Sequence, residues 1–569
     1  MRWSLGITWK WLGRMLRRTA GGKTGDGSLH DRGARGHASS VKRNEQGLRR
    51  PLPEDPAPAS IAEVEQWLRD ALGSPPDLVT RSLRPAVDPD TRILIAYLSS
   101  LVPKGVVAQS VVSPLVGNKT EEAEKRYRRL RSPSERLEYL GEALIETGEL
   151  QQAGSRRAVL EGICRGQTAI FLQGSDRVLL AGTQAPRSRG IDEPTLEASL
   201  RGPHDGLTED LESNLAQIRR RLPHPDLQVF TLQVGDISRT RVAVVYLQNL
   251  ARPDVIREIV ERLRGIRIDG VLDTGYLEDH IIDARLRLFP VVLVTERPDR
   301  VVGNLLEGRA AILVDGSPSA LVAPLNIGVL FQAADDYYLQ PVVATMARLM
   351  RFIGIQASLT LPALYVALVS FHQELIPTTF FARVAAGREG IPVSSLGEAL
   401  LMGGAFEVLR EAGSRLPRQV GQAVSVVGAV VVGEAATRAS LISPLMLIVT
   451  AVTAITSFLV PFYAGAATLW LPRVLFTILA GMFGLVGVSW GFMVGLYYLS
   501  ALRSFGTPYL SPVAPLVASD LKDFMVRVPW WVMVRRPKEP GGLRPQRKPS
   551  PQPPGPGART TGGKTGERR

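Results

Sequence analysis

The chain is poor in the residues that build disulfides, metal centres and many catalytic sites. Its 569 residues include one cysteine, Cys164, and six histidines without metal-ligand spacing. A single cysteine forms neither an intrachain disulfide nor a zinc cluster. The phosphate-binding pattern GxxxxGK[ST] and the zinc pattern HExxH are both missing from the sequence. We therefore expect no cofactor, no bound metal and no enzyme activity.

Charge is missing from two long stretches near the C-terminus. Asp, Glu, Lys and Arg are absent from Ala439 to Pro472 and again from Val474 to Leu502. A helix needs about 20 apolar residues to cross the ~30 Å hydrocarbon core of a bilayer. The region from Leu339 to Leu502 is therefore predicted to be a polytopic helical membrane domain. The aromatic and basic start of the chain has no secretory h-region, so the N-terminal half is expected in the cytosol.

Four spans are predicted, near Phe352 to Phe371, Gln419 to Val432, Leu441 to Val460 and Val474 to Leu499. The segment from Thr378 to Pro417 carries too many charges for a lipid-facing span, and we interpret it as a re-entrant or interfacial pair of helices. An even number of spans keeps both termini in the cytosol. Six spans are possible if the intervening helices also cross.

The entrance to the membrane domain is predicted from its aromatic and basic residues. Tyr337 and Tyr338 suit an interfacial aromatic belt, and Arg348 and Arg351 suit the cytoplasmic edge of the first span. We therefore expect all four side chains at the membrane surface.

The two ends of the chain are strongly basic. The formal net charge is +14, and much of the excess lies in residues 1–59 and 538–569, which we expect to be disordered. Basic tails can bind the phosphates of nucleic acids. Beside membrane spans, attraction to anionic lipid headgroups is the better interpretation, so no nucleic-acid partner is expected.

Residues 60–333 are predicted to fold as two α/β or α+β subdomains, residues 60–190 and 191–333. A helix begins at Ser60 as N-cap, and the runs TAIFLQ and RVLLAG form a hairpin around Gly-Ser-Asp. Another helix has Pro253 in its first turn, a third begins at Pro298, and Asp315 to Pro318 form a hairpin turn. The overall expectation is a two-part α/β (α+β) cytosolic domain, a membrane domain over 334–512 and a juxtamembrane segment over 513–537.

The second predicted span has a face of small and polar residues. Gln422, Ser425, Ala429 and Gly433 recur at i, i+3, i+7 and i+11, which is one side of a helix. Close packing of helices through small residues explains such a face. A pore wall explains it equally well, with valines forming a hydrophobic gate and a carboxylate at one end attracting cations. The candidate pore-lining residues are Gln422, Val424, Ser425, Val427, Ala429, Gly433 and Glu434.

Two carboxylates are predicted at membrane depth, Glu398 and Glu407. An unpaired carboxylate there is costly. Arg410, Arg415 and Arg418 are near enough in sequence to be partners, so structural ion pairing is favoured over ion conduction.

A series of short motifs occurs in a fixed order along the chain. The soluble part contains ARPD at Ala251, GYLE at Gly275, TERPD at Thr295, NLLEGR at Asn304 and ILVDGSP at Ile312. Then follow DDYY at Asp335, LPALYVAL at Leu361, REGIP at Arg388, EALLM at Glu398, SPLM at Ser443 and DLKD at Asp520. In this order they resemble the GerA family of spore germination proteins, specifically the A-type subunit of nutrient germinant receptors. The resemblance covers roughly Ser60 to Pro537.

The resemblance implies a role in germination. A-type subunits lie in the inner membrane of endospores with B-type and C-type partners, and self-associate, as pentamers, into a nutrient-gated cation channel. The germinant itself is expected on the B-type partner. One departure is Glu434, where the family pattern has a glutamine, and a carboxylate there would alter ion selectivity. Two alternatives stay open: a paralogue that serves the dipicolinic-acid channel, and a secondary transporter, which would require paired inverted repeats.

Overall fold

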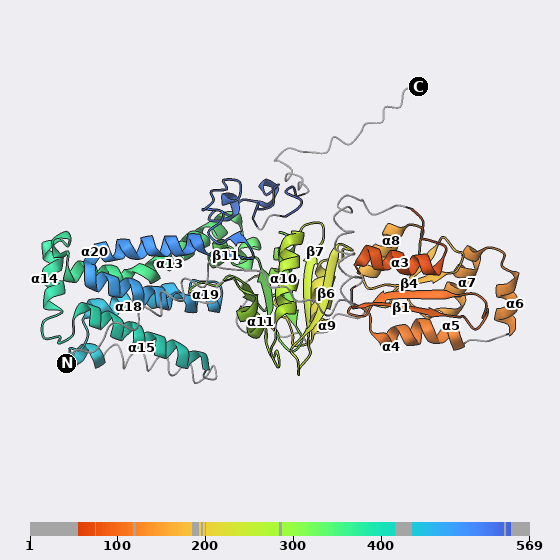
Figure 1. The fold of residues 1–569 in the computed structure, drawn as a ribbon, viewed down its shortest axis with the longest axis horizontal. Coiled ribbons are helices and arrows are strands. Elements are labelled where there is room, and N and C mark those ends of the chain that lie inside the picture. The colour runs from red at the N-terminus through yellow and green to blue at the C-terminus, as the bar shows by residue number, and fades with distance from the viewer. Residues whose placement is uncertain are drawn as a thin grey trace, which may run out of the picture. The chain divides into compact units, whose positions relative to one another are not determined.

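The computed structural model describes residues 55–547 apart from 74, 118–120, 185–192, 195–196, 198, 200, 284–286, 416–434 and 540–541. Within this part of the chain, two sheet domains are followed by a domain of helices (Figure 1). Both large sheets are five-stranded, and every ladder in them is antiparallel. The predicted choice between α/β and α+β is therefore decided in favour of α+β.

The first sheet has the strand order β1-β2-β4-β5-β3. Its strands are β1 (Leu78–Leu83), β2 (Ile93–Leu98), β3 (Leu150–Ala153), β4 (Thr168–Leu172) and β5 (Val178–Ala181). Every residue of β2, β4 and β5 is buried. Helices cover both faces of the sheet (Figure 1), which is why its central strands are continuous apolar runs rather than alternating ones. The helices are α3 (Ile61–Leu72), α4 (Lys104–Val107), α5 (Ser113–Gly117), α6 (Glu121–Arg129), α7 (Pro133–Leu144) and α8 (Arg156–Cys164), with a π-helical turn over Ala108–Val112.

The local signals of this domain are confirmed with one difference. The predicted hairpin is β4 to β5, where Phe171 pairs with Val178 and Gly174 takes φ of 84° in the turn. The predicted first helix is α3, which ends at Gly73 in the left-handed region. Ser60 occupies the N-cap position, but its hydroxyl forms no capping hydrogen bond.

Cys164 is buried at the end of α8, and burial raises the pKa of its thiol to about 12. Below that pH the thiol keeps its proton, and the thiolate is the reactive form. We therefore expect the folded protein to resist iodoacetamide at pH 8, with labelling at least a hundredfold slower than after denaturation. Mass spectrometry after timed labelling measures this, and equal rates in the two states would contradict the burial of the thiol.

The second sheet has the order β6-β7-β9-β10-β8, which repeats the first order strand for strand. Its strands are β6 (Leu227–Val234), β7 (Thr240–Leu247), β8 (Leu293–Thr295), β9 (Ala310–Val314) and β10 (Ala320–Ala323). The helices occupy matching places in both domains, since one precedes the first strand and one lies between the third and fourth. Two domains with the same strand order and helix placement thus stand in tandem, a repeat that the sequence analysis did not predict.

The helices of the second domain are α9 (Leu211–Arg221), α10 (Pro253–Gly265), α11 (Thr274–Ile281) and α12 (Pro298–Leu305). The two with proline in the first turn, α10 and α12, begin where the sequence predicts. Pro253 and Pro298 both stand in first turns, where a missing N–H costs nothing. The predicted final hairpin is β9 to β10, with Gly316 at φ of 90° in its turn.

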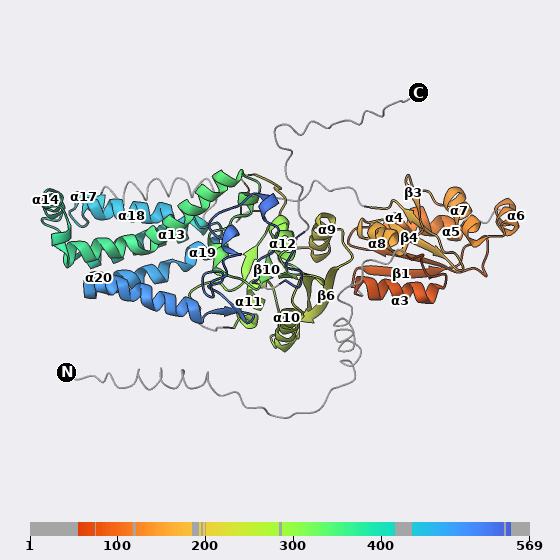
Figure 2. The ribbon, with the colours of Figure 1, turned by 90° about the horizontal axis from the view of Figure 1, so that it is seen from above.

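The helical domain begins after two 3₁₀ turns, η2 (Ile327–Leu330) and η3 (Ala334–Tyr337). Its helices are α13 (Pro341–Ser370), α14 (Thr378–Ala386), α15 (Ser395–Arg415), α17 (Ala436–Arg438), α18 (Pro444–Ser457), α19 (Tyr463–Thr468) and α20 (Trp470–Ala501). Short elements follow: η4 (Gln373–Leu375) after α13, then β11 (Arg503–Ser504), β12 (Thr507–Pro508), η6 (Leu521–Asp523) and η7 (Trp530–Val532). Figure 2 shows α14 and α17 at the same end of this bundle.

α20 is a helical hairpin and not one straight helix. Gly484 interrupts it with φ of 61° and ψ of −139°. The rings of Phe476 and Phe492 lie 5.1 Å apart, whereas sixteen residues of continuous helix would separate them by about 24 Å. The sequence predicts one span from Val474 to Leu499, but the structure folds this segment back on itself at Gly484. Its two arms are antiparallel, and a Cβ at Gly484 would meet His372, just after α13.

α15 runs lengthwise along the bundle. Ser395 at its start hydrogen-bonds to Ser370 at the end of α13, and Phe406 further along packs on Phe458 with ring centroids 6.2 Å apart. Its 21 residues are about 31 Å long. The predicted pair of charged helices is therefore the short α14 and this long α15, which has the length of a span and not of a short interfacial helix.

By length and composition, α13 and the stretch Gly465–Ala501 are the described helices apolar enough to cross a membrane. The latter is the stretch divided at Gly484, and α18, the predicted third span, is shorter at 14 residues. The predicted second span from Gln419 to Val432 lies outside the described residues. The predicted total of four spans is thus not established.

Candidate functional site at the domain junction

Three motifs that are far apart in the sequence meet where the second sheet domain joins the helical domain. TERPD leads from β8 into α12, DDYY forms η3 just before α13, and DLKD ends in η6. We call the side chains that they bring together the junction cluster. Its members are Arg297, Asp299, Asp335, Asp336, Tyr337, Tyr338, Arg348, Arg351 and Asp523.

Asp336 is the centre of the junction cluster, and its side chain is completely buried. Arg348 donates from Nε to its Oδ2 over 3.0 Å, and Arg351 donates from Nη1 to the same oxygen over 2.8 Å. The two arginines are three residues apart on α13 and therefore lie on one face of the helix. The backbone N–H of Ala333 also donates to Asp336 over 3.1 Å. This buried carboxylate thus has the partners that a buried charge requires.

The junction cluster extends from Arg348 to the C-terminal segment. Nη1 of Arg348 donates to the Asp523 carboxylate over 2.9 Å and to its backbone carbonyl over 2.6 Å. The Tyr337 hydroxyl donates to the other Asp523 oxygen over 2.8 Å. Burial and the neighbouring carboxylates raise the pKa of Tyr337 well above its ordinary value, so the hydroxyl remains a donor at neutral pH. One arginine of α13 therefore links the start of the helical domain to a segment 175 residues later.

The remaining members link η3 to the second sheet domain. Arg297 forms a two-pronged contact with Asp299, with distances of 3.0 and 2.8 Å, and also donates to Asp335 over 2.9 Å. The Tyr338 hydroxyl donates to Asp299 over 2.9 Å. Burial alone raises the pKa of Asp299, but the hydrogen bonds from Arg297 and Tyr338 outweigh it and hold that pKa below the ordinary value. Asp299 is therefore ionised throughout the neutral range.

These residues, predicted at the membrane surface, have protein partners in the structure. Arg348 is almost fully buried, and Arg351 and Tyr337 are partly buried, because each is committed to a carboxylate. Only Tyr338 is exposed, and it too has an acidic partner. The motif residues form specific contacts between domains instead of a nonspecific aromatic and basic belt.

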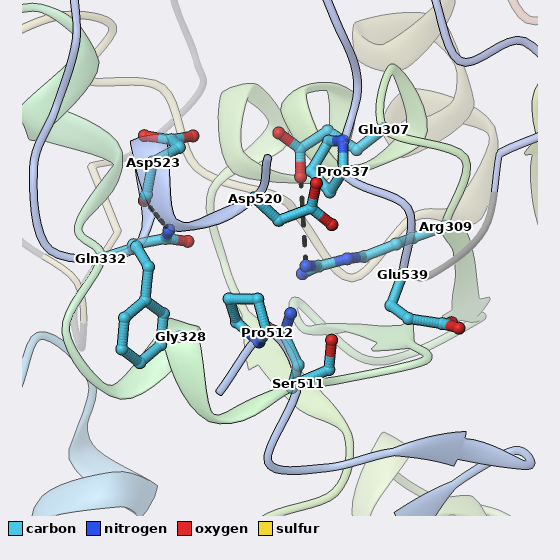
Figure 3. Close-up of a pocket in the computed structure, with 12 residues that line it drawn as sticks. Glu307, Arg309, Gly328, Gln332, Ser511, Pro512, Asp520, Asp523, Pro537 and Glu539 are labelled. Carbon is cyan, nitrogen blue, oxygen red and sulfur yellow. Dashed lines mark hydrogen bonds and ion pairs between the residues drawn. The ribbon is translucent and has the colours of Figure 1, made fainter. Parts of the chain in front are cut away.

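A small pocket borders the junction cluster (Figure 3). It holds about 30 Å³, and Figure 3 shows Glu307, Arg309 and Asp520 around it, with Ser511 below them. Burial raises the pKa of Glu307 and lowers that of Arg309, which lies 4.0 Å away. A space of this size suits one or two water molecules rather than an organic ligand.

The predicted carboxylates of the helical domain have arginine partners. Glu407 is bound to Arg410, as the spacing predicts, whereas Glu398 is paired with Arg388 at 3.2 Å. Arg388, which lies in the REGIP motif, was not among the predicted partners. Arg415 ends α15, Arg418 lies outside the described residues, and neither side chain is described.

Glu398 is completely buried, and a serine of α18 connects it to a tyrosine of α13. The Ser443 hydroxyl, at the N-cap of α18, donates to its Oε2 over 2.8 Å. The Tyr365 hydroxyl of α13 lies 3.0 Å from that of Ser443. Glu398 thereby connects α15 to α18 directly and to α13 through Ser443.

All candidate pore-lining residues lie outside the described residues. They are Gln422, Val424, Ser425, Val427, Ala429, Gly433 and Glu434. Their assignment to a pore therefore stays a prediction from the sequence. In the part of the chain that is described, no group of three His, Cys, Asp or Glu side chains is placed to hold a metal ion.

Fold and site together define a class of protein: tandem antiparallel-sheet domains joined by buried ion pairs to a bundle of apolar helices. Residues 66–539 match the Bacillus/Clostridium GerA spore germination protein family, and the chain belongs to that family. It is 38% identical to spore germination protein KA of Bacillus subtilis (strain 168), over 87% of this chain and 88% of that protein. It is 35% identical to spore germination protein GerLA of Bacillus cereus, over 84% and 95%. The resemblance seen in the motifs is confirmed.

Two further similar proteins are a membrane protein and a solved N-terminal domain. The uncharacterized membrane protein YfkQ of Bacillus subtilis (strain 168) is 36% identical over 78% of this chain and 84% of that protein. A solved structure, the N-terminal domain of the A subunit of the Bacillus megaterium spore germinant receptor GerK3, is 29% identical. It covers 48% of this chain and 98% of that domain with a TM-score of 0.38. Because the chain belongs to this family and has two helices long and apolar enough to cross a membrane among its described residues, it is a membrane-associated spore germination protein.

Proposed function

We propose that this chain is the A-type subunit of a nutrient germinant receptor and forms, with copies of itself, a nutrient-gated cation channel of the spore membrane. Its partners are B-type and C-type receptor subunits, and the expected oligomer is a pentamer. The observation that carries the proposal is the family match over residues 66–539, which includes both the sheet domains and the helical domain. Relatives named as spore germination proteins match most of this chain.

The contacts at the domain junction support a role in gating. A receptor channel must pass a change in its soluble part to its membrane helices, and such coupling needs defined contacts between them. Arg348 and Arg351 on α13 both form ion pairs with Asp336 of η3. The neighbouring residue of η3, Asp335, forms an ion pair with Arg297 at the start of α12. Movement of the second sheet domain would therefore pull on the start of α13.

The same geometry supports a multi-pass topology with both termini in the cytosol. α13 begins at the junction cluster. α20 ends at the second sheet domain, since the Tyr498 hydroxyl near the end of α20 accepts a hydrogen bond from the backbone N–H of Leu288 over 2.8 Å. First and last helices that meet one soluble domain require an even number of crossings between them.

Cation flux tests the proposal directly. The chain is reconstituted into liposomes with its B-type and C-type partners, and K⁺ efflux is recorded with and without mixtures of amino acids, sugars and nucleosides. We expect efflux that depends on nutrients and on this chain. Efflux that never responds to any nutrient, with all partners present, would contradict the receptor proposal.

The predicted gate gives a second test. Val424→Ala and Val427→Ala shorten apolar side chains that would close a pore by excluding water, so we expect cation leak without nutrients. The matched control is Val452→Ala, because Val452 is an exposed valine on α18, outside the predicted gate. Wild-type cation retention in both gate variants would remove the segment 419–432 from the pore.

A further inference from the structure

A single cation interrupts the apolar C-terminal helices. Arg473 is the one charged residue between Ala439 and Leu502, and its side chain is almost fully buried. A charged residue inside a bundle of membrane helices is costly unless it has a partner, and it therefore marks a site by default. The question is what balances this guanidinium.

The contacts of Arg473 satisfy part of its hydrogen-bonding capacity and none of its charge. Nε donates to the backbone carbonyl of Ser358 over 2.8 Å, and Nη2 donates to the Ser358 hydroxyl over 2.6 Å. Both acceptors are neutral. Across the described ranges, Arg473 has no ion pair with a carboxylate. Glu407 on α15 is near enough to attract it electrostatically, but its ion pair is with Arg410. An arginine has five N–H donors, so donors remain for a further partner.

Arg473 lines a cavity of about 240 Å³ between α13, α15, α18 and α20. Most of the wall is apolar, with Phe406, Met446 and Trp470 among the larger side chains. Three threonines add hydroxyls, at positions 450, 453 and 477, and each already donates to a backbone carbonyl of its own helix. Arg473 is therefore the charged group of an otherwise largely apolar cavity, a pattern typical of small-molecule sites.

Two glycines of α15 keep part of the cavity open. A Cβ added at Gly403 or Gly404 would meet no atom within 4 Å. Glycine in the middle of a helix costs about 1 kcal/mol relative to alanine. Adjacent glycines at a cavity wall thus maintain space at some expense of helix stability.

We propose that this cavity binds a small amphiphilic anion, in which a carboxylate or phosphate pairs with Arg473 and a short apolar body fills the space beside Trp470 and Gly403. The planar guanidinium matches both anions, since each offers two oxygens to parallel N–H donors. Such an anion comes either from solution or from the headgroup of a lipid. The site lies within the helices and is independent of the nutrient-channel proposal.

Binding of radiolabelled hexanoate to the full-length protein tests the site. The protein is placed in phosphatidylcholine nanodiscs, empty nanodiscs give the background, and hexanol competes as the neutral analogue. We expect saturable binding, and displacement by hexanol at least tenfold weaker than displacement by unlabelled hexanoate. No saturable binding above the background would overturn the proposal.

Two substitutions locate the binding. Arg473→Gln should weaken hexanoate binding by about tenfold or more, the loss expected for one charge-assisted hydrogen bond. Gly403→Leu should abolish it by filling the cavity while leaving Arg473 in place, which keeps the test valid if the arginine variant misfolds. Gly413→Leu is the matched control, because Gly413 also lies on α15 with open space around it but does not line the cavity. Wild-type binding in Gly403→Leu would overturn the proposal.

Nanodisc composition identifies the source of the anion. If an anionic lipid headgroup occupies the site, phosphatidylglycerol nanodiscs should suppress hexanoate binding in the wild type. If the ligand is a soluble anion, hexanoate binds equally in both kinds of nanodisc. Either result supports the anion site, provided that Arg473→Gln removes the binding.

Discussion

Asp336→Asn should destabilise the protein more than any other single isosteric change at the domain junction. The amide removes the charge that balances two arginines of α13 and points N–H donors at guanidinium N–H donors. Removing one partner of a buried ion pair costs roughly 3–5 kcal/mol. We expect a loss of about 3 kcal/mol in the free energy of unfolding, at the lower end of that range, because Arg348 keeps Asp523 as a second partner. Chemical unfolding in nanodiscs, followed by tryptophan fluorescence, measures it.

The matched control is Asp279→Asn. Its side chain is 79% exposed and lies 3.6 Å from Arg287, so the same chemical change is made in water. Exposed ion pairs contribute about 0–1 kcal/mol, and we expect a change within that range. Equal losses in the two variants would show that the burial of Asp336 has no energetic consequence and would contradict the junction cluster as described.

Glu398→Gln should loosen the packing of α15 against α13 and α18. The amide is the same size and can still accept from Ser443, but it leaves the Arg388 guanidinium without its carboxylate. A hydrogen bond to a charged group contributes about 1.5–3 kcal/mol, and we expect a loss of unfolding free energy in that range. The thermal unfolding midpoint in nanodiscs should fall accordingly.

A double-mutant cycle shows whether the loss belongs to the pair. Arg388→Met alone and Glu398→Gln alone should each destabilise, and the double variant should lose less than the sum of the two. Glu389→Gln is the control, because Glu389 is an exposed glutamate next to Arg388 in the sequence. Additive losses would mean that Arg388 and Glu398 do not stabilise each other.

The sequence alone determined which segments are apolar and where several turns and helix starts lie. Runs without charge are poorly solvated along their length, so the long apolar helices of the C-terminal half were predictable from composition. Hairpins such as β4 to β5 and β9 to β10 were predictable because their turns contain Gly174 and Gly316, which take positive φ. Proline in a first turn likewise marked the starts of α10 and α12. These signals are local, and they act through the conformation of a few adjacent residues.

The tertiary structure decided which distant residues meet. Glu398 pairs with Arg388, which precedes α15, because the start of α15 packs against α13 and α18. Arg348 is buried at the junction because Asp336 and Asp523 enclose it from two other segments. Hydropathy could not place these charges, since the energy of a buried charge depends on its partner and not on its neighbours in the sequence.

The break in α20 at Gly484 is a feature of the backbone that the sequence likewise could not predict. Apolar residues on both sides of this glycine predict one long helix, and glycine permits a turn without requiring one. The turn forms because Phe476 can then pack against Phe492 and the tip against the end of α13. The sequence by itself therefore determined the family and the apolar character of the helices. The tertiary structure alone decided their path and the partners of their few charges, because both depend on contacts between segments that are far apart in the chain.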